Sequence, residues 1–124
     1  MTNMKGKKAL LEMLRAEGVR HIFGNPGTSE SPFIDALGDF PDLQYVLVLQ
    51  EGVAIGMADG YARATGRAAF VQLHIDSGLA NGISLMIDAY NDNTPMVVVS
   101  GNYDTRKLAE NRADLPTLVR PVTK

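Results

Sequence analysis

The stretch YVLVLQEGVAIGMADGYARATGRAAFVQLH, residues 45–74, decides the fold class. It begins with a continuous apolar and β-branched run at 45–49, which is typical of a strand buried on both faces. Small and apolar residues then recur at helical spacing over 51–64, and a second strand pattern follows at 68–73. A strand, a helix and a strand in this order predict a parallel β-α-β unit.

The sequence on both sides of this stretch continues the alternation of helices and strands. Ser31 followed by Pro32 predicts the start of a short helix, because serine caps helices and proline fits their first turn. The further predicted helices cover 5–17, 31–37 and 79–90, and the further strands cover 19–23 and 96–99, the last of them buried. We therefore predict an α/β fold, a three-layer sandwich with a mainly parallel sheet and helices on both faces.

The C-terminal part departs from this pattern after Gly101. Residues 104–114 are rich in charge, and we expect a helix or a loop there. Residues 115–124 contain two prolines, and we expect them to be extended. The sequence thus predicts one folded domain over 1–105 and a charged, extended tail over 106–124.

Length and composition narrow the possible functions. The chain of 124 residues has the size of one domain, and its formal charge of -2 gives no basic field that would attract nucleic acid. The absence of cysteine excludes disulfides, thiolate catalysis and cysteine-ligated metals. No apolar run approaches the about 20 residues of a membrane helix, and the N-terminus lacks the apolar segment of a signal peptide. We expect a cytoplasmic protein without nucleic-acid or membrane partners.

Three glycines stand four residues apart in the predicted helix 51–64, at Gly52, Gly56 and Gly60. Each lowers helix propensity by about 1 kcal/mol relative to alanine. We therefore expect this helix to approach a neighbouring strand, helix or ligand closely along its glycines.

Polar residues follow three of the predicted strands. These are the loop 24–30, the pair Gln50-Glu51, and the segment 74–78. In a parallel α/β sheet these loops meet at one edge, where ligands bind. Glu51 is the strongest candidate for chemistry, because it directly follows a strand and begins a helix. The alternative is an ordinary first-turn acid that interacts with the helix dipole.

The other candidates at this edge are less specific. The backbone N–H groups of loop 24–30 could hold a phosphate or a carboxylate, although the loop lacks the spacing of known phosphate motifs and could be a structural turn. The hydroxyls of Thr28 and Ser29 could bind a substrate carboxylate or the local backbone. His74 could transfer protons or be structural. We interpret His21 as structural, and two histidines at this separation predict no metal site.

Three segments together resemble a known family. They are IFGNPGTSESPF (22–33), LQEGVAIGMADGYARATGRAAFVQLH (49–74) and GLANGISLMIDAYNDNTPMVVVSG (78–101). Over about residues 5–105 the chain resembles the N-terminal pyrimidine-binding domain of thiamine diphosphate-dependent enzymes. This family includes acetolactate synthases, pyruvate oxidases and 2-oxo acid decarboxylases, and the resemblance is strongest to the benzoylformate decarboxylase type.

The resemblance implies a role for each matching residue. Glu51 would hydrogen-bond ring nitrogen N1′ of the cofactor's aminopyrimidine, favouring the imino form that removes a proton from the thiazolium carbon. Thr28 would contact the substrate carboxylate, with a methyl group added to the family's serine, and His74 would transfer protons. The implied catalytic set is thus Glu51, His74 and Thr28, and the implied cofactor-binding set is Glu51, Asn25, Pro26, Gly27 and Asn81, with no metal ligand.

The resemblance also implies partners. In the family, a Gly-Asp-Gly…Asn segment of a separate domain holds the diphosphate and Mg²⁺, and this chain has no such segment. Active sites of the family form between domains of two subunits, so a homo-oligomer, or a subunit of a split enzyme, is expected. We expect the pyrimidine-binding half of a 2-oxo acid decarboxylase, with little activity alone. The alternatives are an acetolactate synthase-like carboligase domain, a non-catalytic association module, and a generic nucleotide-binding domain.

Overall fold

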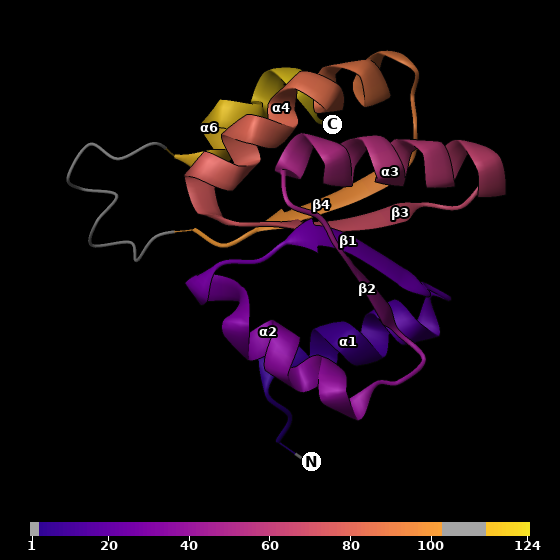
Figure 1. The fold of residues 1–124 in the computed structure, drawn as a ribbon, viewed down its shortest axis with the longest axis vertical. Helices are drawn as coiled ribbons and strands as arrows, with labels where there is room; N and C mark the ends of the chain where they lie inside the picture. Colours follow the sequence, from indigo (N-terminus) through magenta and orange to yellow (C-terminus); the bar gives the residue numbers. More distant parts are fainter. Residues whose placement is uncertain (1–2, 103–113) are drawn as a thin grey trace.

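The computed structural model describes residues 3–102 and 114–124. Four parallel strands form one sheet in the order β2-β1-β3-β4. The strands are β1 (His21–Asn25), β2 (Gln44–Leu47), β3 (Ala69–Leu73) and β4 (Met96–Ser100). The predicted parallel sheet is confirmed, and all four strands point their carboxyl ends toward the same edge (Figure 1).

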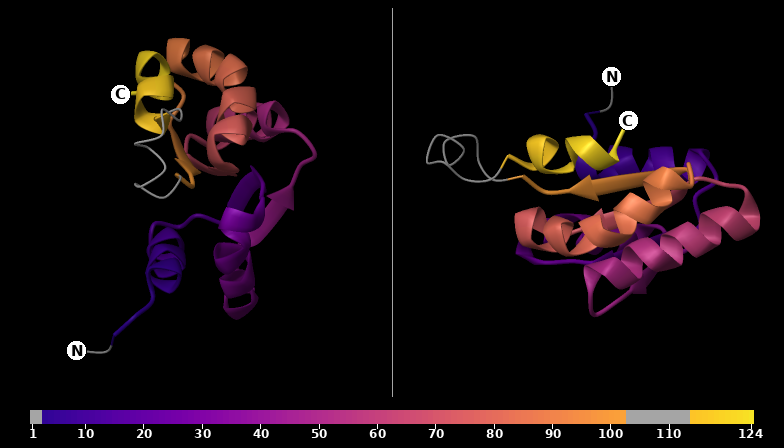
Figure 2. Two further views of the ribbon diagram at one scale, coloured as in Figure 1. Left: turned by 90° about the vertical axis from the view of Figure 1, so that its left-hand side faces the viewer. Right: turned by 90° about the horizontal axis from the view of Figure 1, so that it is seen from above.

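Helices cover both faces of this sheet. One face carries α1 (Gly6–Ala16) and α2 (Ser31–Ala36), while the other carries α3 (Glu51–Thr65), α4 (Ile75–Asn91) and α6 (Leu115–Val119) (Figures 1 and 2). Short 3-10 turns lie at η1 (Thr28–Glu30), η2 (Leu37–Asp39) and η3 (Arg120–Val122). The predicted three-layer α/β sandwich is therefore confirmed.

The core divides into two parts because side chains alternate across a strand. Ile22 of β1 and Phe70 of β3 pack with Leu11 and Phe40 on the side of α1 and α2. Their neighbours along the strands face the other way and join the core beneath α3 and α4; these are Phe23, Ala69 and Val71. The small residues of α3 let this helix lie close to the sheet.

The outer strands differ from the prediction that they are buried on both faces. Along β2, Gln44 and Leu47 are exposed, and Leu49 beyond its end is 92% exposed. In β4, Val97 is 51% exposed. Both strands have a neighbour on one side in the described sheet, whereas β3 is paired on both sides and buried at every residue. The apolar runs therefore led to a prediction of more burial than these two strands have at the edges of the described sheet.

The prediction of close approach along α3 is correct for two of its three glycines. A Cβ atom on Gly52 would lie 3.4 Å from the backbone oxygen of Asn81 of α4, and one on Gly56 would lie 3.2 Å from Leu85 of α4. Around Gly60 no other atom lies within 4 Å of the Cβ position. The contact between α3 and α4 thus fades toward the C-terminal half of α3, where the glycine serves no packing role.

Several boundaries also differ from the prediction. Strand β1 covers His21–Asn25 rather than 19–23, and β2 covers Gln44–Leu47 rather than 45–49. Helix α4 begins at Ile75 rather than Leu79, so Asp76-Ser77-Gly78 forms its first turn. Residues 115–122 are helical rather than extended: the Asp114 side chain accepts a hydrogen bond from the Thr117 N–H, and Leu115 is buried beneath α4. Proline in the first turn is compatible with this helix. The helix or loop expected at 104–113 lies outside the described residues.

No helix among the described residues is long and apolar enough to span a bilayer.

Candidate functional site

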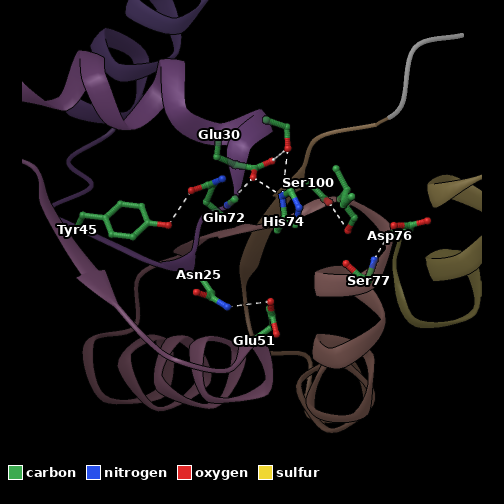
Figure 3. Close-up of polar contacts among 12 residues, drawn as sticks. Asn25, Glu30, Tyr45, Glu51, Gln72, His74, Asp76, Ser77 and Ser100 are labelled. Carbon is green, nitrogen blue, oxygen red and sulfur yellow. Dashed lines mark hydrogen bonds and ion pairs between the residues drawn. The ribbon is translucent and has the colours of Figure 1, made fainter.

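The candidate residues meet at the carboxyl edge of the sheet, as predicted. Asn25 ends β1, Glu51 follows β2 as the first residue of α3, and His74 directly follows β3. Asn25 is paired in register with Leu73, so the loop after β1 lies level with His74. Figure 3 shows these side chains, from three strand ends, in one region of the molecule.

Glu51 is held by amide groups from both sides. Its side chain is 7% exposed, although it lies at the start of a helix. Oε1 accepts a hydrogen bond of 3.0 Å from Asn25 Nδ2, and Oε2 accepts one of 3.0 Å from Asn81 Nδ2 of α4. The Gln50 side chain caps α3 by accepting from the Val53 N–H, which leaves the Glu51 carboxyl free of the capping role.

Gly78 connects Glu51 and His74 into one site. A Cβ atom on Gly78 would lie 3.1 Å from Glu51 Oε1 and 3.2 Å from His74 Cβ. The first turn of α4 therefore passes directly against both side chains. Asn81 lies one turn later on the same helix, so α4 contributes two residues to the site, Gly78 and Asn81.

A second acid, Glu30, forms a cluster with His74 that sequence reasoning missed. Glu30 is 6% exposed; its Oε2 lies 2.7 Å from His74 Nδ1 and accepts a hydrogen bond of 2.9 Å from the Gly27 N–H. Ser29 Oγ donates to Glu30 Oε1 at 2.6 Å and lies 3.2 Å from His74 Nδ1. The signal in the sequence was the three-residue spacing of Gly27 and Glu30 at a helix start, half of a capping box.

The ionisation of Glu30 follows from these contacts. Burial raises the pKa of the Glu30 carboxyl, but hydrogen bonds from Ser29, His74 and the Gly27 N–H outweigh burial and hold the pKa below its ordinary value. Nearby Tyr45 donates to Gln72 Oε1 at 2.7 Å, and burial together with the Glu30 charge raises its pKa. Glu30 is therefore an anion at neutral pH.

The structure places the remaining predicted residues of loop 24–30 as follows. Pro26 is half-buried, and Gly27 lies so close to the His74 ring that a Cβ atom would overlap it. Thr28 is exposed at the start of η1, and the hydroxyl in contact with His74 belongs to its neighbour Ser29. The roles of Thr28, Pro26 and Gly27 toward a ligand stay predictions.

His21 lies away from the candidate site. His21 begins β1 at the opposite end of the sheet, where its ring packs against Phe23 and Tyr61. Its Nδ1 is buried without a hydrogen-bond partner in the described part of the chain. Within residues 3–102 and 114–124 no three acidic or histidine side chains converge on a metal site.

The sequence of this chain matches a known family over most of its length. Residues 4–118 match the family profile described as thiamine pyrophosphate enzyme, N-terminal TPP binding domain. The chain belongs to this family. Membership in the thiamine pyrophosphate enzymes confirms the resemblance seen in the sequence, and it implies thiamine diphosphate as the cofactor.

Individual relatives include both decarboxylases and synthases. The chain is 47% identical over 94 residues to benzoylformate decarboxylase of Pseudomonas aeruginosa, covering 75% of this chain and 17% of the relative. It is 34% identical over 127 residues to the acetolactate synthase large subunit of Haemophilus influenzae, covering 100% of this chain and 22% of that relative. A solved structure, the 4-hydroxybenzoylformate decarboxylase of Rhodococcus jostii, aligns with a TM-score of 0.86 and 36% identity, covering 95% of this chain and 23% of that one.

These proportions show that the chain spans about a fifth of the length of the relatives it matches. The family and the fold are thus shown for this part, while the two kinds of relative leave the reaction of the whole protein to be proposed.

Proposed function

We propose that this chain supplies the pyrimidine-binding half of the active site of a thiamine diphosphate-dependent 2-oxo acid decarboxylase of the benzoylformate decarboxylase type. One observation carries the proposal. The Glu51 carboxyl is buried at the carboxyl edge of the parallel sheet, with one amide donor on each of its oxygens.

The donor set around Glu51 fits a heterocyclic nitrogen. Each carboxyl oxygen can take part in a further hydrogen bond beyond the one from its amide. Glu51 forms no ion pair with a cation in the described part of the chain, so no internal charge competes for the carboxyl. Gly78 packs against Oε1 with no side chain of its own, so no Cβ atom covers this oxygen from α4. A buried carboxyl in this setting suits the sharing of a proton with a ring nitrogen.

The residues of this chain would then act in defined ways. Glu51 would hold a proton at the pyrimidine ring nitrogen, with Asn25 and Asn81 fixing its orientation. When bound, the cofactor supplies the electron sink for cleavage of the carbon–carbon bond, while the protein orients and polarises it. His74 would act as a general acid or base toward the substrate, and the Thr28 hydroxyl would contact the substrate carboxylate.

Decarboxylation is favoured over carboligation by His74 and its surroundings. The histidine follows a strand that reaches the same edge as Glu51, and its Nδ1 is within hydrogen-bond distance of the Glu30 carboxylate. An imidazole held beside a carboxylate is suited to proton transfer at a substrate. Sequence identity does not choose between the two reactions, because the chain is 47% identical to a benzoylformate decarboxylase and 48% identical to a putative acetolactate synthase large subunit of Mycobacterium tuberculosis. The carboligase alternative draws on the acetolactate synthase relatives, which match the full chain.

The proposal includes partners. A separate diphosphate-binding domain, from another region or another subunit, would hold the diphosphate and Mg²⁺ and would complete the site in a homo-oligomer. We further propose that the protein acts in the cytoplasm. A non-catalytic association module is the remaining alternative.

The test is decarboxylation in the presence of a diphosphate-binding domain, thiamine diphosphate and Mg²⁺, with benzoylformate and pyruvate as probes. We expect CO₂ release that Glu51→Gln lowers by roughly 10²–10⁴-fold, because the acid–base contact is lost. Glu17→Gln removes the same charge from the exposed end of α1 and should leave the rate unchanged.

The remaining outcomes separate the alternatives. Acetolactate from pyruvate would favour the carboligase, and a rate unaffected by Glu51→Gln would contradict the role of Glu51. No activity with either probe, together with no binding of the cofactor, would favour an association module.

A further inference from the structure

The contacts of Glu30, Ser29 and His74 allow one assignment of their hydrogens. Ser29 has one hydroxyl hydrogen, and its shortest contact, 2.6 Å, is to Glu30 Oε1, a carboxylate oxygen that accepts. With that hydrogen donated to Glu30, the 3.2 Å contact between Ser29 Oγ and His74 Nδ1 requires a hydrogen on Nδ1. The 2.7 Å contact between Glu30 Oε2 and the same nitrogen requires the same hydrogen.

The backbone holds all three groups in place. The Gly27 N–H donates to Glu30 Oε2 and fixes the carboxylate from the loop side. Gly27 packs so closely against the imidazole ring that a Cβ atom on it would overlap His74 Nδ1. From the end of β4, Gly101 closes the other side, since a Cβ atom there would lie 2.9 Å from Glu30 Oε1. The ring and the carboxylate are therefore packed into a single arrangement.

We propose that Glu30 is a positioning residue that fixes His74 as the Nδ1–H tautomer and leaves Nε2 as the nitrogen that exchanges protons. The carboxylate accepts the Nδ1 hydrogen, and Ser29 Oγ accepts it more weakly. Nε2 of the neutral ring is then an acceptor, and in the protonated ring it is the donor. The tautomer follows from the contacts alone, whereas the use of Nε2 in catalysis rests on the proposed function.

The charge state of Glu30 supports this arrangement. Its pKa lies below the ordinary value because three hydrogen bonds outweigh burial, so the carboxylate is available as an acceptor at neutral pH. The other titratable group near it, Tyr45, donates its hydroxyl to Gln72 and has a raised pKa, so it does not compete for the Nδ1 hydrogen.

The experiment is a ¹⁵N NMR measurement of the imidazole nitrogens in the 124-residue chain, at a pH where the rings are neutral. We expect His74 of the wild type to carry its hydrogen on Nδ1. Glu30→Ala removes the acceptor of that hydrogen, and the ratio of Nδ1–H to Nε2–H forms should fall by about tenfold, since a hydrogen bond to a charged group is lost. Glu30→Gln keeps an acceptor oxygen and should give an intermediate ratio.

The chain provides its own controls. The nitrogens of His21 lie at the other end of the sheet and should keep their tautomer in every variant, which also reports that the fold is retained. Glu17→Gln removes a charge far from the cluster and should not change His74. A wild-type His74 with its hydrogen on Nε2 overturns the proposal even if the variants fail to fold. An unchanged ratio of the Nδ1–H to the Nε2–H form of His74 in folded Glu30→Ala also overturns the proposal.

Activity of the complete enzyme is a second readout, and it separates failure of the proposed function from failure of the positioning role of Glu30. In the complete enzyme, Glu30→Gln should lower kcat more than it changes KM, and it should alter the pH profile of kcat, because the orientation of the ring changes and binding does not. If the tautomer is as expected but no decarboxylation is found with any partner, the proposed function is wrong and the positioning of His74 by Glu30 stands. If the enzyme is active and Glu30→Gln has the wild-type pH profile, the catalytic use of this arrangement is overturned.

Discussion

The backbone of Gly27 lies against the imidazole ring of His74 so closely that a Cβ atom on Gly27 would overlap the ring. The two residues come from the ends of different strands, β1 and β3, which are neighbours in the sheet. Their contact means that the loop after β1 and the first turn of α4 share one packed layer. A single methyl group added at Gly27 would therefore disturb the arrangement of the site.

Gly27→Ala should therefore displace the His74 ring and weaken its contact with Glu30. We expect the free energy of unfolding to fall by about 1–3 kcal/mol, as for other overpacked sites. Urea denaturation measures this. Gly38→Ala is the matched control, because the Cβ position of Gly38 has no neighbour within 4 Å, and its stability should stay within about 0.5 kcal/mol of the wild type. Equal stability of the two variants would contradict the packing.

Asn81→Asp should place a second carboxylate against Glu51. The amide nitrogen that it replaces lies 3.0 Å from Glu51 Oε2, so two like charges would meet at a buried acid. We expect a loss of about 1–3 kcal/mol at pH 7 from the lost hydrogen bond and the repulsion. Thermal unfolding between pH 4 and pH 8 should show this loss shrinking as the pH falls and one carboxyl takes up a proton. Asn81→Ala removes the donor without adding charge, so its deficit should vary less with pH, and identical pH dependences would refute the contact.

The glycines of the two long helices should respond in opposite ways to alanine. In α3, Gly60 has open space around its Cβ position, so Gly60→Ala should stabilise the protein by about 0.5–1 kcal/mol through helix propensity. In α4, a Cβ atom on Gly82 would lie 2.9 Å from Leu73 Cδ1 and 3.3 Å from Ile55 Cγ1, both fully buried. Gly82→Ala should destabilise by about 1–3 kcal/mol. Chemical denaturation compares the pair, and a stabilised Gly82→Ala would show that the α4–β3 contact is looser than described.

Glu30 should make the stability of the chain sensitive to acid. Its pKa in the folded protein lies below its ordinary value of 4.5, so the unfolded chain binds a proton first as the pH falls. The stabilisation by the Glu30 anion is therefore complete well above pH 4.5, declines as the unfolded chain protonates, and is lost once the pH falls through the folded pKa. Glu30→Gln should flatten the stability curve in this acidic range. The same slope in Glu30→Gln and the wild type, followed by circular dichroism, would rule out this contribution.

Local sequence patterns predicted the helices and strands whose formation depends on residues close together in the chain. The helical spacing at 51–64 and the strand pattern at 68–73 gave α3 and β3 to within one residue at each end. The position of Glu51 directly after a strand placed it at the correct edge of the sheet. The family resemblance named Asn25 and Asn81 only as cofactor-binding residues, and the hydrogen bonds from their amides to the two oxygens of Glu51 were not predicted.

The features that were missed depend on distant contacts. Glu30 matters because His74, 44 residues later in the chain, lies beside it, and no local pattern reports that contact. The exposure of Leu49 and Val97 depends on which strands lie at the edge of the sheet. At the C-terminal end, prolines suggested an extended segment, whereas capping by Asp114 and burial of Leu115 produce helix α6.

The two amides on Glu51 have a consequence for ligand affinity. A flexible glutamate that captures a ligand loses rotamer freedom on binding, at about 0.5–1.5 kcal/mol for an immobilised side chain. Here Asn25 and Asn81 immobilise the carboxyl during folding, so that entropy loss is already complete before a heterocycle arrives. The Glu51 carboxyl is therefore preorganised, and a ligand that bonds to it meets an acceptor whose orientation the folded chain has already fixed.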